Sequence, residues 1–360
     1  MRFWYSGMKT QIMDVTLRDG SYAINFQFSE HDTRKIGRAL EQSGIPFVEI
    51  GHGQGLNASN FKNGIALCTD EEYLASAQEA YQTCKYGMFC IPGIARLEDL
   101  DLLKKYGASF VRIGCNIDKI DDTEPFIKRA KELGLIVAAN YMKSYTATED
   151  EFEACVKKSM GYGVDYVYIV DSAGCMLPED IKKYYDVVKR IDGPKVGFHG
   201  HNNLGLANSN SLYAAELGFD LIDCSLQGLG RGAGNASTEL LVALFQIEFG
   251  VKDYDEKKLV QFGEEYVNPL VKNCGLYGLD VYCGIAGFHS SYMKYIHRFA
   301  SKYSVNPYDL IVEYCKYDKI NMDKDKLEEI ARSLPKDFDI NLSKYGFGRY
   351  IGDEQNNNNN

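Results

Sequence analysis

The chain has 360 residues, with 40 basic and 50 acidic side chains and a formal charge of −10. Apolar residues make up 45% of it and charged residues 25%, which is typical of a soluble globular protein of one or two domains. There is no block of Lys and Arg and no run of about 18 apolar residues, which argues against a nucleic-acid partner and a membrane span. The first residues, MRFWYSGMKTQ, lack the apolar core of a secretory signal. Because the ten cysteines lie far apart, mostly in apolar stretches, we expect reduced thiols in a cytoplasmic enzyme that acts on a small molecule.

Short apolar runs alternate with longer amphipathic ones from about residue 12 to about residue 250. We expect strands at 12–16, 47–50, 86–91, 110–114, 135–140, 166–170, 195–199 and 221–225. The amphipathic stretches between them predict helices at 30–43, 70–84, 123–133, 149–162, 178–191 and 203–217. Ser29 and Pro178 are typical of helix beginnings, and glycines such as Gly163 and Gly218 of helix ends.

Eight strand-helix units in about 240 residues favour a (β/α)₈ TIM barrel over residues 9–250. A doubly wound parallel sheet is the alternative, but its glycine fingerprint belongs after the first strand, where this chain has Leu-Arg-Asp-Gly-Ser. From 251 to 345 only helices are expected, at 257–271, 290–303, 306–317 and 323–333, and they form a helical C-terminal domain. The tail at 346–360 ends in a polar Gln-Asn tract that we expect to be disordered.

The segment VGFHGHNN places His199 and His201 at the end of the seventh expected strand. Side chains two residues apart in a strand point to the same face, so both imidazoles can reach one metal ion at the mouth of the barrel. Asp19, just after the first strand, is a candidate third ligand, because only strand eight separates strands one and seven in a closed barrel. Two histidines and one carboxylate leave half of an octahedral shell for water and substrate. The alternative is a pair of hydrogen-bonded structural histidines.

Other polar residues follow the first and eighth strands. Arg18 can stabilise an oxyanion that develops on a substrate, or it can form a structural ion pair with an inner carboxylate. The glycine-rich segment at 228–235, GLGRGAGN, lies where barrels often bind phosphate through backbone N–H groups, although a tight turn explains the same glycines. Asn235 is a candidate for a further metal ligand or for the N-cap of the eighth helix.

Three more side chains follow strand ends. Lys143, in NYMKS, is placed to form a Schiff base at the mouth, but we interpret it as a solvated loop lysine. Cys115 and Cys175 have no obvious base near them in the sequence, so we expect both to be packing residues.

At TLRDGS, EIGHGQG, DSAG, FHGHNNLGLA and GLGRGAGN the chain resembles the DRE-TIM metallolyase family, which includes HMG-CoA lyase and the isopropylmalate and homocitrate synthases. Within this family it is most similar to the 4-hydroxy-2-oxovalerate aldolases, through TLRDGSYAINFQFS, EIGHGQGL and the C-terminal segment GIAGFHSSYMKYIHRFASKYSV. The GERAGN motif of the acetyl-CoA-dependent synthases is absent, since this chain has GRGAGN.

The resemblance implies a divalent metal, Mn²⁺ before Mg²⁺ or Co²⁺, held by Asp19, His199 and His201. Arg18 would stabilise a pyruvate enolate, and Ser172 in DSAG, together with Arg18 and His199, would bind the 2-oxo acid. The implied reaction is a carbon-carbon lyase reaction that cleaves or forms a C–C bond next to a 2-oxo acid and releases or takes up an aldehyde.

The chain departs from these aldolases at two positions. They carry a catalytic histidine where this chain has Tyr22, and a tyrosine where it has His289. A proton relay needs one group that titrates near neutral pH and one hydroxyl, and the exchanged pair still supplies both. We therefore predict that His289 is the general base and Tyr22 its hydrogen-bonding partner. The alternative is two unrelated substitutions, with His289 at the surface.

Two other functions stay open at this point. One is a condensing synthase that joins an acyl-CoA to a 2-oxo acid on the same metal. The other is an inactive scaffold, motivated by Tyr22, whose helical C-terminal domain binds a partner. The similar aldolases associate with an acylating aldehyde dehydrogenase, so the C-terminal domain at 251–345 is where we expect such a partner or a homodimer interface.

Overall fold

The computed structural model describes residues 9–61, 64–271 and 277–350 of the chain. Its eight strands are all parallel and form a closed barrel in sequence order, with the last strand paired to the first. The strands are β1 Gln11–Asp14, β2 Phe47–Ile50, β3 Lys85–Cys90, β4 Phe110–Asn116, β5 Ile136–Met142, β6 Tyr166–Asp171, β7 Lys195–Gly200 and β8 Leu221–Cys224. The predicted barrel and all eight predicted strands are confirmed, with ends that differ by at most two residues.

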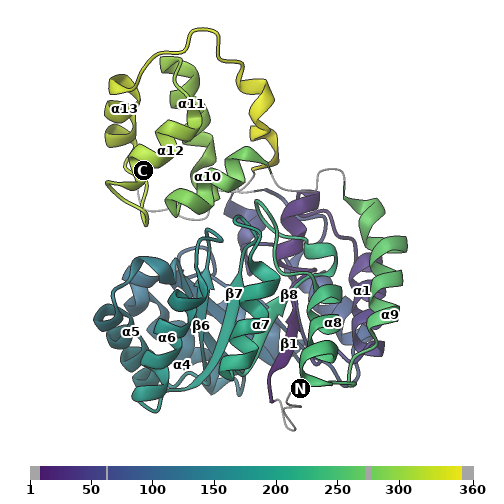
Figure 1. Ribbon diagram of the computed structural model, residues 1–360. Helices are drawn as coiled ribbons and strands as arrows, with labels where there is room; N and C mark the ends of the chain where they lie inside the picture. Colours follow the sequence, from purple (N-terminus) through teal and green to yellow (C-terminus); the bar gives the residue numbers. More distant parts are fainter. Residues whose placement is uncertain (1–8, 62–63, 272–276, 351–360) are drawn as a thin grey trace.

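Helices follow the strands around the outside of the barrel (Figure 1). Their ends follow local signals: Ser29 accepts a hydrogen bond from the backbone N–H of Asp32 and caps α1, and Gly163 and Gly218 end α5 and α7 in the left-handed conformation. These helices are α1 Glu30–Gln42, α2 Asp70–Ala80, α3 Leu100–Lys105, α4 Glu124–Glu132, α5 Glu149–Tyr162, α6 Pro178–Arg190, α7 Ala207–Leu217 and α8 Thr238–Phe249. Within the described part of the chain, no helix has the length and apolar character needed to cross a bilayer.

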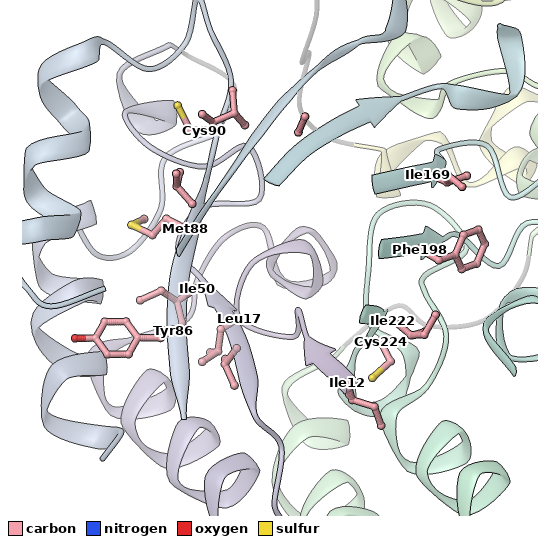
Figure 2. Close-up of a cluster of buried hydrophobic side chains, with 14 of the residues drawn as sticks. Ile12, Leu17, Ile50, Tyr86, Met88, Cys90, Ile169, Phe198, Ile222 and Cys224 are labelled. Carbon is pink, nitrogen blue, oxygen red and sulfur yellow. The ribbon is translucent and has the colours of Figure 1, made fainter. Parts of the chain in front are cut away.

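The main hydrophobic core lies between the barrel and its helices. Alternate strand residues point outward into it, including Ile50, Met88, Phe198 and Ile222, which Figure 2 shows among the buried side chains. The residues between them point into the barrel. There, one apolar cluster is made of Met13, Val15, Phe47, Phe110, Ala138, Tyr166, Tyr168, Val170 and Leu221. The same alternation sends Glu49, Arg112, His199 and Asp223 inward.

A second, smaller core is built from the C-terminal helices α10 Gly278–Ala286, α11 Met293–Tyr303, α12 Pro307–Cys315 and α13 Lys324–Ser333. Helix α10 is not among the helices that we expected from the sequence. These helices stand beyond one end of the barrel, whereas α9 Glu256–Phe262 lies along its side next to α1 and α8 (Figure 1).

The residues just after the expected domain boundary at 251 pack against the barrel. Leu259 of α9 and Val267 after it belong to the barrel core, and Leu279 belongs to the second core. We therefore propose that the division between the domains falls between Val267 and Leu279. The predicted disorder of the final polar tract concerns 351–360, which lies outside the described residues, while 342–350 forms two short 3₁₀ turns.

Candidate metal centre and active site

Asp19, His199 and His201 meet at the carboxyl ends of β1 and β7. Each offers a ligand atom, and these atoms all lie within 4.8 Å of one another. The two Nε2 atoms are 3.4 Å apart, and all three side chains are buried. The structure thus brings together the three residues that the sequence singled out as metal ligands.

Neighbouring groups orient both imidazoles. Nδ1 of His199 is 2.9 Å from the carboxylate of Asp223, and Nδ1 of His201 is 3.2 Å from the carbonyl of Gly234. With Nδ1 as the donor in each ring, both Nε2 atoms keep the lone pair that binds a metal. Burial lowers the pKa of His201 to about 3, so its ring is neutral at pH 7.

The carboxylate of Asp19 is held ionised. Burial by itself would raise its pKa, but the guanidinium of Arg18, 2.7 Å from Oδ1, keeps that pKa well below its ordinary value. An ionised carboxylate and two imidazoles form a donor set that suits divalent transition metals.

Asn235 supports this carboxylate. Its Nδ2 donates to Oδ2 of Asp19 at 2.9 Å and to the carbonyl of Leu229 at 2.8 Å, while its Oδ1 is buried and has no hydrogen-bond partner among the described residues. Helix α8 begins at Thr238 and Ser237 caps it, so the interpretation of Asn235 as the N-cap is wrong. A buried amide oxygen without a partner, next to three convergent ligands, fits a metal centre.

A chain of buried ion pairs runs behind the triad. Arg18 donates through Nε to Glu49 at 2.6 Å, Arg112 contacts both Glu49 and Asp223, and Asp223 in turn holds His199. The alternative of an ion pair between Arg18 and an inner carboxylate is thus realised, and the same guanidinium also lies beside Asp19. Glu49, Arg112 and Asp223 were missed by the sequence analysis, although single charged residues in the apolar runs FVEI, FVRIG and LIDC were the signal.

The glycines of the segment 228–235 are explained by close approach. A Cβ atom on Gly230 would lie 2.7 Å from Oδ2 of Asp19, and one on Gly234 would lie 2.2 Å from the carbonyl of Gly228. This approach lets the backbone N–H of Arg231 donate to Oδ2 of Asp19 at 3.3 Å. The contacts favour the tight turn over a phosphate loop.

Arg231 is a functional candidate that the sequence analysis did not single out. Its side chain is buried, Nη1 lies 2.8 and 3.0 Å from the ring nitrogens of His289, and Nη2 lies 3.5 Å from Nε2 of His201. Its guanidinium carbon is 6.0 Å from the centre of the Tyr22 ring. Arg231 and Tyr22 also line a cavity of about 630 Å³ in front of the glycine-rich segment.

His289 is a buried residue, so the alternative that places it at the surface is wrong. It precedes the 3₁₀ turn Ser290–Tyr292 of the C-terminal domain, and Nδ1 lies 2.6 Å from the hydroxyl of Ser291. Burial and then the charge of Arg231 lower its pKa well below the ordinary value, which makes the ring neutral at pH 7. Tyr22 and His289 thus border the same guanidinium from two domains.

Lys143 is fully buried, so its interpretation as a solvated loop lysine is wrong. Its ammonium group donates to the hydroxyl of Tyr292 at 3.1 Å and to the carbonyl of Ile320, both in the C-terminal domain. Its backbone N–H donates to Oγ of Ser172 at 3.0 Å. Lys143 therefore ties the end of β5 to the C-terminal helices.

The cysteines agree with the expectation of reduced thiols. The nine that lie in described parts of the chain are free. Cys115 is buried, and Cys175 is partly buried.

Comparison with known proteins identifies the family. The family model described as HMGL-like matches residues 9–265, which is the barrel together with α9. The chain belongs to the HMGL-like family. The predicted family resemblance and the class of lyase-type enzymes are therefore confirmed.

Two relatives and one solved structure illustrate the similarity. A 4-hydroxy-2-oxovalerate aldolase of Carboxydothermus hydrogenoformans is 36% identical over 332 residues, which cover 91% of this chain and 98% of the relative. An oxaloacetate decarboxylase of Mycobacterium tuberculosis is 38% identical over 278 residues, or 77% of this chain and 82% of the relative. The crystal structure of HMG-CoA lyase from Bacillus subtilis has a TM-score of 0.63 at 15% identity and covers 76% of this chain and 97% of its own, which supports the barrel fold.

Proposed function

We propose that this protein is a divalent-metal-dependent aldolase that cleaves or forms a C–C bond next to a 2-oxo acid, with pyruvate as one product. The observation that carries the proposal is the buried triad of Asp19, His199 and His201 with the Arg18 guanidinium beside it. Aldolases that share over 30% of the sequence across almost the whole chain support it. We further propose Mn²⁺ as the metal, with Mg²⁺ or Co²⁺ as substitutes, because an oxygen- and imidazole-rich site accepts several divalent ions.

The metal would be held by Asp19, His199 and His201, and the free Oδ1 of Asn235 is the natural additional ligand. When bound, it would supply Lewis-acid polarisation of the 2-oxo group, which lowers the energy of an enolate. Arg18 would place a second positive charge beside the developing enolate oxygen. Glu49 fixes that guanidinium, so little reorganisation is needed when charge develops.

His289 and Tyr22 are the proposed acid-base pair. In the cleavage direction His289 would take the proton of the substrate's C4 hydroxyl, since its ring is neutral and able to accept one. The C3–C4 bond then breaks, C4 becomes the aldehyde carbon, and the electron pair stays on C3 until C3 is protonated. Tyr22 would hydrogen-bond the same hydroxyl. Ser172, near the end of β6, is proposed to help seat the carboxylate of the 2-oxo acid.

The first test measures pyruvate release from 4-hydroxy-2-oxo acids. Activity should vanish in EDTA and return on addition of Mn²⁺, and His201→Ala should abolish both Mn²⁺ binding and activity. Activity that survives full chelation would refute the metal mechanism, and trapping of substrate on Lys143 by borohydride would favour a Schiff base. Release of thiol from acetyl-CoA in the presence of 2-oxo acids would favour a condensing synthase instead.

The second test concerns the acid-base pair. His289→Ala should lower turnover by about 10²–10³, which is within the range for loss of a general base, while Mn²⁺ affinity stays unchanged. Near-normal turnover of His289→Ala together with an inactive Tyr22→Phe would show that Tyr22 acts by itself.

A location and a partner complete the proposal. The free cysteines of the described residues support a reducing compartment, and we propose the cytoplasm. An acylating aldehyde dehydrogenase that takes up the released aldehyde, or a second copy of this chain, is proposed to bind at the C-terminal domain.

A further inference from the structure

We propose that Arg231 selects a substrate with a second carboxylate, one attached to C4 of the 4-hydroxy-2-oxo acid. Such a substrate is a dicarboxylate of the 4-hydroxy-2-oxoglutarate type, and its cleavage gives pyruvate and a 2-oxo acid aldehyde. This inference rests on the proposed aldolase function, which it makes more specific.

Arg231 lies in a suitable position for this role. Arg231 spans the distance between the triad and the proposed base, with Nη2 3.5 Å from Nε2 of His201 and Nη1 2.8 Å from His289. The 2-oxo acid end of the substrate belongs at the triad, and the C4 hydroxyl belongs at His289. The remaining substituent on C4 is therefore within reach of the guanidinium between them.

The side chain of Arg231 also has the right chemistry to bind a carboxylate. Arginine presents a planar fork of N–H donors that matches a carboxylate in two parallel hydrogen bonds. A methyl group at C4 would give the same guanidinium no acceptor beyond the His289 ring that it already contacts. The adjacent cavity of about 630 Å³, which Arg231 lines, has room for the larger substituent.

The charge around the triad favours a second carboxylate on the substrate. Near the triad, Arg18, Arg112 and Arg231 carry positive charge, and Asp19, Glu49 and Asp223 carry negative charge. Buried Lys143 adds a further positive charge on the side of His289. A divalent ion adds two positive charges to this buried layer. A substrate with two carboxylates offsets more of this positive charge than a substrate with one, so the site favours the dicarboxylate.

The chemistry is the same for both kinds of substrate. In 4-hydroxy-2-oxoglutarate the C3–C4 bond breaks with its electron pair left on C3, and His289 takes the hydroxyl proton. C4 leaves as the aldehyde carbon of glyoxylate, with its carboxylate still on Arg231. Protonation of C3 gives pyruvate, so no oxidant or further reactant is needed.

The experiment compares two substrates that differ in one group. 4-Hydroxy-2-oxoglutarate has a carboxylate where 4-hydroxy-2-oxopentanoate has a methyl group, and the methyl proton signal of pyruvate reports the cleavage of both. With Mn²⁺, the wild-type kcat/KM should favour the dicarboxylate by about tenfold or more. Arg231→Met should lower kcat/KM for the dicarboxylate about 10²-fold more than for the methyl substrate, because only the dicarboxylate loses a charge-assisted hydrogen bond.

Two further variants make the result interpretable. Arg231→Lys keeps the positive charge but lacks the planar pair of N–H donors. It should recover part of the preference for the dicarboxylate, and its activity would show that a substitution at this position leaves the protein folded. Arg349→Met is the matched control: Arg349 lines the same cavity but bonds Asp280 and the carbonyl of Gly232, and its loss should affect both substrates by one factor.

The possible failures are distinct. Equal losses on both substrates in Arg231→Met would place Arg231 at the shared 2-oxo acid end and overturn the inference. A wild-type preference for the methyl substrate that Arg231→Met leaves intact would overturn it as well. Absence of pyruvate from both substrates with wild-type enzyme and metal would instead refute the proposed function.

Discussion

Arg112 is the side chain whose removal should affect the barrel most. It is fully buried, and its guanidinium contacts the carboxylates of Glu49 and Asp223, with Nε 2.7 Å from Glu49 and Nη1 2.5 Å from Asp223. Arg112→Met fills a similar volume but removes the charge. Two carboxylates then stay inside the barrel, where Arg18, His199 and Tyr168 remain as partners.

The magnitude follows from burial. Breaking a buried ion pair by removing one partner typically costs 3–5 kcal/mol, because the other charge stays buried without compensation. Because Arg18 and His199 still contact the two carboxylates, we expect the free energy of unfolding to fall by about 3 kcal/mol, the lower end of that range. Burial alone would raise the pKa of both carboxyl groups, an effect that Arg112 now opposes. In the variant their folded-state pKa therefore rises above the unfolded value, so stability is lost as pH increases, and the loss should be larger at pH 8 than at pH 5.

The assay is urea unfolding followed by far-UV circular dichroism at both pH values. Arg129→Met is the control: Arg129 also bonds two carboxylates, Asp101 at 2.6 Å and Glu132 at 3.1 Å, but on the surface. Its loss should cost less than about 1 kcal/mol. A loss for Arg112→Met that equals the control, or that is independent of pH, would refute this reasoning.

Two other substitutions test separate parts of the molecule. Burial raises the pKa of Asp14 from 3.8 to about 7, so the folded state keeps a proton that the unfolded chain has released, and stability present below pH 4 is lost as pH rises to 7. Asp14→Asn should remove this pH dependence and make the protein more stable at pH 8, by about 4 kcal/mol at most, in the same unfolding assay. If the free energy of unfolding changes with pH by the same slope in both proteins, the prediction is wrong. Lys143→Met should loosen the C-terminal domain through loss of the bond to Tyr292, which speeds limited proteolysis and lowers turnover about tenfold with unchanged Mn²⁺ affinity. A complete loss of turnover with unchanged proteolysis would instead indicate a covalent role for Lys143.

The barrel could be predicted because its signals are local. The period-two alternation in each strand sets which residues face the helices, and the same rule sends His199 and His201 to one face. Asp19 joins them because a closed barrel leaves only β8 between β1 and β7. Strand order and strand ends were therefore enough to locate the three candidate ligands.

The rest of the site depends on contacts between distant parts of the chain. Lys143 lies 149 residues from its partner Tyr292, and Arg231 lies 58 residues from His289. Neither side chain has a neighbour in sequence that indicates where it points. Helix α10 was missed because two glycines and two β-branched residues in GLDVYCGIA weaken its helical signal.

The active site draws on two hydrophobic cores, since the triad belongs to the barrel and His289 to the C-terminal helices. Hydrogen bonds such as Asn203 to the carbonyl of Asp280, at 3.0 Å, hold the two together. Partial unfolding that releases only the smaller core would leave the candidate metal ligands in the barrel, but it would move His289 away from them and open the mouth to water. The free energy with which the C-terminal helices dock onto the barrel would then set how often the proposed site is incomplete.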